Sequence, residues 1–312
     1  MIKESLFYGK ILLFGEYGII EDSMGLSIPY DFYKGKLIFE IDDPQVQKAS
    51  NESLKCFFSY LKGLHEDGSS NVKLDLDTFK ADIDRGMLFD STIPQGFGVG
   101  SSGALVAAIY DKYAINRIDK ENLSNDDIVV LKNIFGQMES VFHGKSSGLD
   151  PLICYLNLPI LIKSKTELES VGLPAETADG KGAIFLLNTG NPGKTQPMVN
   201  IFLEKLKQEG FRNVMKQEFK KYNDACIEAF LSKDFKPLLS NMKHLSTVLF
   251  DHFRPMIPDV FHKFWKDGIE SDAYYLKLCG SGGGGFILGF TKDIDVAREK
   301  LKAHQLDVIY HF

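Results

Sequence analysis

Hydrophobic residues recur along the chain with a helical period in several places. Apolar residues at positions 54, 57, 58 and 61 fall three or four residues apart, which predicts a helix over 50–64. The same spacing predicts helices over 103–115 and 125–143, with Ser124 or Asn125 as the cap of the second. From 195 to about 265 the chain is predicted to be mostly helical.

Short apolar runs rich in β-branched and aromatic residues predict strands near the N-terminus and in the middle of the chain. They lie at 5–20, 159–164 and 183–190, and the alternating stretch NVKLDLDTF at 71–79 is also predicted to be a strand. Near the C-terminus, AYYLKL and FILGF flank a glycine loop, and a helix and the strand LDVIYHF follow. This order is half of a split βαβ pattern. A polar, glycine-containing stretch between the two halves predicts one domain over 1–170 and another over 171–312.

Composition narrows the function classes. The 312 residues carry a formal net charge of −6, so no broad basic field is available to hold nucleic acid. None of the four cysteines is spaced as C-x-x-C, which argues against a zinc knuckle, and all four are expected to be buried and inert. The N-terminus has no long apolar segment, so a cytoplasmic protein with no membrane contact is expected.

The stretch GFGVGSSGA at 96–104 precedes the apolar run LVAAIY. A helix N-terminus leaves backbone N–H groups unpaired, and glycine lets a phosphate approach them. The alternative is a turn with Ser101 or Ser102 as helix cap. A G-x-G-x-x-G match within the stretch lacks the preceding strand of a dinucleotide site, and GNPGKT at 190–195 is too short for a P-loop. A second cluster, CGSGGGG at 279–285, is either a tight hairpin or another approach of backbone to ligand.

Four charged residues are candidates for chemistry. Lys10 interrupts an apolar strand, where a lysine is usually paired or reaches a cleft. Asp150 ends the turn HGKSSGLD and is either a base beside a hydroxyl or a helix cap before a proline. The local sequence alone favours the helix cap. Glu16 is either functional or an exposed turn residue, and Glu139 either functional or part of a solvated helix face.

Three segments in order resemble the GHMP kinases: GKILLFGEYGII, IPQGFGVGSSGALVAA and KLCGSGGGGFILGF. The resemblance covers most of the chain and is strongest to the mevalonate kinases, whose E-x-x-x-HG-x-x-SG-x-D segment is similar to ESVFHGKSSGLD. It implies an α+β fold with two domains. The N-terminal half would be ribosomal protein S5 domain 2-like and the C-terminal half ferredoxin-like.

The resemblance also implies an activity, namely transfer of phosphate from ATP, with Mg²⁺, to the hydroxyl of a small alcohol. Mevalonate, converted to 5-phosphomevalonate in isoprenoid biosynthesis, is the expected acceptor, and a homodimer is the one protein partner considered. By the same resemblance Asp150 is the base, Lys10 its partner, and Ser102 and Glu139 the metal ligands. Nucleotide contacts are Gly96, Gly98, Gly100, Ser101, Ser102, Gly103, Ala104, Gly282 and Gly283, and substrate contacts are Glu16, Tyr17, Ser147 and Thr195.

Two departures from the family keep alternatives open. Tyr8 replaces the usual proline, and Tyr17 replaces the histidine of mevalonate kinases, as in phosphomevalonate kinases. A phosphomevalonate or small-sugar kinase is therefore the first alternative, with Lys145 and Lys194 available for a phosphorylated acceptor. A nucleotide-binding regulator without catalysis and a dinucleotide oxidoreductase are the others.

Overall fold

The computed structural model describes residues 5–39, 43–120, 122–178 and 180–312. The chain forms two compact units, each assembled from several segments. Unit 1 contains the described residues of 1–10, 28–95 and 100–158, and unit 2 contains 11–27, 96–99 and the described residues of 159–312. The division of the sequence at residue 170 stays a prediction.

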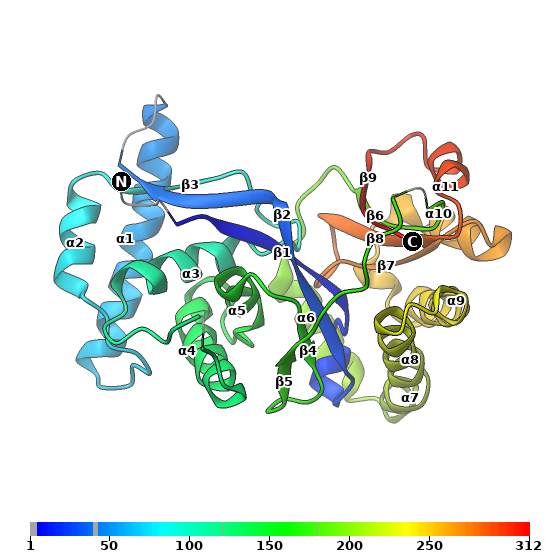
Figure 1. Ribbon diagram of the computed structural model, residues 1–312, viewed down its shortest axis with the longest axis horizontal. Helices are drawn as coiled ribbons and strands as arrows, with labels where there is room; N and C mark the ends of the chain where they lie inside the picture. The colour runs from blue at the N-terminus through cyan, green and yellow to red at the C-terminus, as the bar shows by residue number, and fades with distance from the viewer. Residues whose placement is uncertain (1–4, 40–42, 121, 179) are drawn as a thin grey trace. The chain divides into compact units, whose positions relative to one another are not determined.

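Helices make up most of unit 1 (Figure 1). Helix α3 packs against both α4 and α5, and α1 packs against α2. The start of α4 is fixed by a capping box, in which Ser124 accepts from the N–H of Asp127 and the Asp127 carboxylate accepts from the N–H of Ser124. The helices are α1 (Pro44–Glu66), α2 (Leu76–Asp84), α3 (Ser101–Tyr113), α4 (Asn125–His143) and α5 (Leu149–Leu156).

One sheet contains the first five strands of the described chain, in the order β1-β2-β4-β5, with β3 also paired to β2. The long strand β2 pairs antiparallel with β4 near its start and with β3 near its end. A 3₁₀ turn over Gly18–Glu21 connects the first two strands. The strands are β1 (Phe7–Phe14), β2 (Gly25–Ile38), β3 (Leu88–Ser91), β4 (Ile160–Ile162) and β5 (Leu168–Ser170).

The second sheet lies in unit 2 and is antiparallel throughout, in the order β7-β8-β6-β9. The strands are β6 (Ala183–Asn188), β7 (Tyr275–Leu278), β8 (Phe286–Thr291) and β9 (Leu306–His311). A helical region separates β6 from β7, and α11 (Ile294–Lys300) separates β8 from β9. This is the βαββαβ arrangement, so the ferredoxin-like second half is confirmed.

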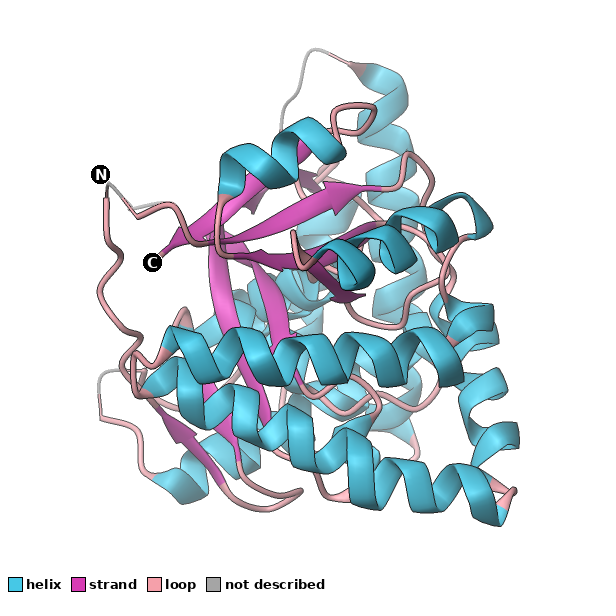
Figure 2. Ribbon diagram, turned by 90° about the vertical axis from the view of Figure 1, so that its right-hand side faces the viewer, coloured by secondary structure: helices cyan, strands magenta, loops and turns pink. Residues whose placement is uncertain are grey.

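Unit 2 also contains a helical layer. Helices α8 and α9 lie side by side and α9 contacts β7 and β8 (Figure 2). Among the largest fully buried side chains is Trp265 of α10, whose indole N–H donates to the carbonyl of Ser246 in α9 at 3.0 Å. The helices are α6 (Thr195–Leu206), α7 (Glu209–Val214), α8 (Lys220–Leu231), α9 (Phe235–His252) and α10 (Asp259–Ser271), with a π turn at Met215–Phe219 and a 3₁₀ turn at Arg254–Met256.

Most of the predicted elements are confirmed, but 71–79 is not a strand. Residues from Leu76 onward form α2, because Asp75 caps the helix by accepting from the N–H of Thr78 at 3.0 Å. The expectation for the cysteines is wrong at one position, since Cys56 is exposed while the other three are buried. No helix in the described part of the chain is both long and apolar enough to cross a bilayer.

Candidate active site

The glycine-rich stretch leads into the N-terminus of α3, within unit 1. The cap is Gly100, in the left-handed region at φ 84°, and no side chain caps the helix, so the alternative of a serine cap is wrong. A Cβ on Gly100 would lie 2.9 Å from Cγ of Lys10. Glycine is therefore required both by the backbone angle and by the space. The amide groups of the first helical turn carry partial positive charge, which suits a bound phosphate.

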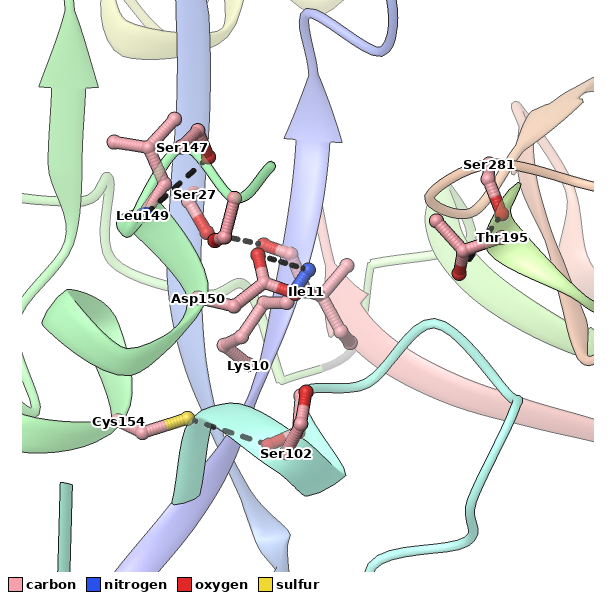
Figure 3. Close-up of polar contacts among 12 residues, drawn as sticks. Lys10, Ile11, Ser27, Ser102, Ser147, Leu149, Asp150, Cys154, Thr195 and Ser281 are labelled. Carbon is pink, nitrogen blue, oxygen red and sulfur yellow. Dashed lines mark hydrogen bonds and ion pairs between the residues drawn. The ribbon is translucent and has the colours of Figure 1, made fainter. Parts of the chain in front are cut away.

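Asp150 and Lys10 form an ion pair in the same unit. The Lys10 Nζ lies 2.8 Å from Asp150 Oδ1, and the Lys10 side chain is 3% exposed whereas that of Asp150 is 40% exposed (Figure 3). Asp150 is the second residue of α5, whose cap is Gly148, so Asp150 is not the cap and Pro151 is the third helical residue. A buried cation thus orients a carboxylate that remains accessible to a reactant.

A close helix contact places α3 beside α5. A Cβ on Gly103 would lie 2.8 Å from the carbonyl carbon of Asp150 and 2.9 Å from the nitrogen of Pro151. Because real Cβ atoms do not approach that closely, only glycine allows this packing. The first turn of α3 therefore lies against the first turn of α5.

Glu139 of α4 is buried, so the alternative of a solvated helix face is wrong. Its two oxygens each accept a hydroxyl hydrogen bond, one from Ser102 at 2.8 Å and one from Ser146 at 2.5 Å. Burial raises the pKa of Glu139 to about 7, and the charge of Asp150 adds to this, although the two hydroxyls and Lys10 act in the opposite direction. Ser102 and Glu139, the two predicted metal ligands, are thus in direct contact although they lie far apart in the sequence.

The Ser102 and Glu139 oxygens fit a magnesium ion. No three His, Cys, Asp or Glu side chains within the described residues gather into a metal site. Magnesium does not need such a cluster, since it usually takes one or two protein oxygens and completes its shell with water and phosphate. In an octahedron with ligands at 2.0–2.1 Å, neighbouring oxygens lie about 2.9 Å apart. The observed separation of 2.8 Å is close to that value.

Two other features adjoin this group. The Cys154 thiol lies 3.7 Å from the carbonyl of Gly100, and burial raises its pKa, so the thiol stays protonated and is no nucleophile.

An open cavity of about 540 Å³ lies beside the turn before α5. It is lined by Asn71, Val130, Lys132, Asn133, Ile134, Gly136, Gln137, Ser140, Ser146 and Ser147. Ser147 accepts from the N–H of Leu149 at 3.4 Å.

Ser101 and Ala104 also lie in unit 1, whereas Glu16, Tyr17, Thr195 and the glycines at 96, 98, 282 and 283 lie in unit 2. Glu16 is buried and forms an ion pair with Lys277 of β7, whose ammonium also donates to the carbonyl of Leu278 at 2.9 Å. Glu16 is therefore not an exposed turn residue. Tyr17, at φ 57°, donates its hydroxyl to the carbonyl of Ser281 at 2.7 Å, and burial raises the pKa of that hydroxyl.

The glycines of unit 2 bring several loops into close contact. The N–H of Gly193 donates to the carbonyl of Gly96 at 2.7 Å, and a Cβ on Gly98 would clash with the Cys279 carbonyl. The N–H of Gly283 donates to the carbonyl of Met256 at 2.6 Å, so that donor is already used within the protein. The assignment of Gly282 and Gly283 to the nucleotide stays a prediction.

Thr195 begins α6, and its Oγ1 lies 3.5 Å from Oγ of Ser281, also in unit 2 (Figure 3). Its role as a substrate contact stays a prediction.

Sequence reasoning missed two residues beside those it named. Lys277 interrupts the apolar strand YLKL just as Lys10 interrupts β1, so the same signal could have found it. Ser146 had no such signal, because a serine in a polar turn has no distinctive pattern.

Part of the chain matches a known protein family. Residues 61–157 match the family model described as "GHMP kinases N terminal domain". A search of curated protein sequences finds no match to the chain. Similar solved structures include an L. major mevalonate kinase in complex with R-mevalonate, at 17% identity and a TM-score of 0.64, covering 100% of this chain and 97% of that one.

Two further structures represent other members of the family. A Lactococcus lactis galactokinase complexed with galactose has 12% identity and a TM-score of 0.65, covering 99% of this chain and 94% of that one. A Streptococcus pneumoniae phosphomevalonate kinase in complex with phosphomevalonate and AMPPNP has 15% identity and a TM-score of 0.60, covering 99% and 100%.

Residues 61–157 therefore match the N-terminal domain of the GHMP kinases, and the expected α+β fold is confirmed. The fold of this chain is similar to that of solved mevalonate kinases, which recur among the similar structures.

Proposed function

We propose that this protein is an ATP-dependent kinase that phosphorylates the hydroxyl group of a small alcohol. The observation that carries the proposal is the contact of α3 with α5 at Gly103. It brings a helix N-terminus suited to phosphate beside a carboxylate paired with a buried lysine. Phosphoryl transfer needs this combination of positioning and charge neutralisation more than covalent catalysis.

In the proposed reaction the amides at the start of α3 bind the nucleotide phosphates. Asp150 accepts the proton of the acceptor hydroxyl as its oxygen attacks the terminal phosphorus and the bond to ADP breaks. Lys10 holds the Asp150 carboxylate in place at 2.8 Å and offsets negative charge on the transferred group. Both residues lie in unit 1, as do Ser102 and Glu139.

Ser102 and Glu139 would hold the magnesium ion of Mg-ATP. The ion supplies charge neutralisation at the phosphates. The two side chains contribute hard oxygen ligands from different helices, α3 and α4, and the direct contact between them keeps them together.

Mevalonate is the acceptor we propose, on the resemblance of the turn HGKSSGLD to mevalonate kinases and on the similarity to the solved mevalonate kinases. Phosphomevalonate is the second candidate. It is favoured by Tyr17 in place of histidine and by the similarity to the S. pneumoniae enzyme.

The test is ATP consumption by the purified protein with a panel of acceptors, namely none, mevalonate, phosphomevalonate and galactose. We expect magnesium-dependent ADP formation with mevalonate and little without an acceptor. Asp150→Asn should lower turnover roughly 10²–10⁴-fold while binding of an ATP analogue is retained.

Asp126→Asn is the matched control, since Asp126 is exposed in the first turn of α4. It should behave as the parent. An Asp150→Asn protein with parental turnover would contradict the assigned base, and no phosphorylation of any acceptor would contradict the function.

A further inference from the structure

Ser146 lies between Glu139 and Asp150 in the sequence and contacts the surroundings of both. Its hydroxyl donates to Glu139 Oε2 at 2.5 Å and accepts from the N–H of Gly148 at 3.0 Å. Gly148 is the cap of α5, and Asp150 is two residues further on. One hydroxyl therefore joins the buried carboxylate of α4 to the start of the helix that carries the proposed base.

We infer that Ser146 is a positioning residue for the proposed reaction: it fixes Glu139 in the orientation that binds the magnesium of Mg-ATP. The inference rests on the proposed function and extends it to a residue outside the predicted set. Ser146 acts through Glu139 and Gly148 and touches no reacting atom in this account.

Each oxygen of the Glu139 carboxylate accepts a hydrogen bond from a different serine. Ser102, itself a proposed ligand, contacts Oε1 at 2.8 Å, whereas Ser146 contacts Oε2. With both oxygens held, the carboxylate plane cannot rotate freely about its last side-chain bond. Partners of this kind behind a metal ligand typically change metal affinity or activity by about 10–100-fold when removed.

The surroundings of Ser146 make the hydroxyl separable from the shape of the turn. The backbone of the turn has its own contact, because the Ser146 N–H donates to Oγ of Ser140 at 3.4 Å. Ser146 also lines the open cavity of about 540 Å³, so one extra methyl group has room there. Threonine and valine have the same shape, and only threonine keeps the hydroxyl.

The experiment compares Ser146→Thr with Ser146→Val. Affinity for a fluorescent ATP analogue is measured over a magnesium titration and again in EDTA, and turnover is measured with the best acceptor. In Ser146→Val we expect the magnesium midpoint to rise about 10-fold and turnover to fall, with metal-free nucleotide affinity unchanged. Ser146→Thr should keep the parental midpoint.

Ser140→Ala is the control for the turn, since it removes a neighbouring hydroxyl that does not contact Glu139. It should keep the parental magnesium midpoint. Should valine destabilise the fold in thermal denaturation, Ser146→Ala replaces it in the comparison. Parental magnesium dependence without the hydroxyl, or an equal shift in Ser140→Ala, would overturn the inference while leaving the proposed function standing. A parent protein that binds no nucleotide with magnesium would instead refute the proposed function.

Discussion

At the scale of single residues, the pairing of Lys10 with Asp150 combines full burial of the cation with partial exposure of the carboxylate. The arrangement is costly for the lysine, because a buried ammonium loses hydration that polar contacts within the protein restore only in part. Such a lysine contributes little to stability, and its benefit is expected in the reaction.

We therefore predict that Lys10→Met separates activity from stability. Methionine has a similar length, and Asp150 remains in contact with water, so the free energy of unfolding should change by less than about 1 kcal/mol. Turnover should fall roughly 100-fold through loss of the positive charge. Lys62→Met, at an exposed position of α1, is the control for both measurements. Parental turnover in Lys10→Met would remove Lys10 from the mechanism.

The residues of the site could be named from the family resemblance, but local sequence left each of them open. Asp150 before a proline has the pattern of a helix cap, and Glu139 that of a solvated face. What decides their surroundings is the packing of α3, α4 and α5, which brings Ser102 to Glu139 across 37 positions. Such long-range contacts have no local pattern, and for the same reason Ser146 and the pairing of Glu16 with Lys277 were not predicted.

At the scale of elements, the contact at Gly103 gives a test of helix packing. Replacing glycine by alanine inside a helix normally stabilises it by about 0.5–1 kcal/mol. In Gly103→Ala, however, the new methyl group would meet the Asp150 backbone. We predict a net loss of about 1–3 kcal/mol from overpacking, together with reduced turnover.

Gly63→Ala is the matched control, because Gly63 lies in α1 with no atom within 4 Å of the added Cβ. Urea unfolding should show it slightly more stable than the parent. If Gly103→Ala is stabilised as much as Gly63→Ala, the packing of α3 on α5 is looser than described.

Elements with strong local signals were predicted well. The helix at 125–143 was predicted with its observed bounds from its helical spacing and a candidate cap at Ser124 or Asn125. Ser124 is the observed cap and forms a capping box with Asp127. The strand predicted at 71–79 was wrong. Val72, Leu74 and Leu76 alternate as they would in a strand, and this alternation suggested the prediction. The Asp75 cap starts a helix there, and its register places Phe79 and Ile83 in the core.

At the scale of the whole molecule, the C-terminal part of the sequence predicted the order of elements that forms much of the second sheet. The order strand, strand, helix, strand predicted half of the βαββαβ arrangement. The position of β6 between β8 and β9 could not be read from the sequence, because it depends on pairing between strands separated by a long, mostly helical segment.

Stability of the folded molecule should depend on pH through Glu139. Its pKa is about 7 in the folded protein and 4.5 ordinarily, so between these values the native state keeps a proton that the unfolded chain has lost. Stability therefore falls as pH rises from 4.5 to 7 and is constant above. Glu139→Gln has no such loss of stability. The melting temperature of the variant minus that of the parent should therefore be larger at pH 8 than at pH 5.

The difference in relative stability between the two pH values should be about 3 kcal/mol or less. Glu52→Gln, at an exposed position of α1, is the control for the same chemical change. The same melting difference for Glu139→Gln at both pH values would mean that Glu139 ionises as an ordinary glutamate.

The unequal burial of the cysteines has a practical consequence. Cys56 is exposed on α1, whereas Cys154, Cys226 and Cys279 are buried. A maleimide dye should therefore attach to Cys56 in the native protein and leave the three buried thiols unmodified. Helix α1 can thus carry a single label without any engineered substitution.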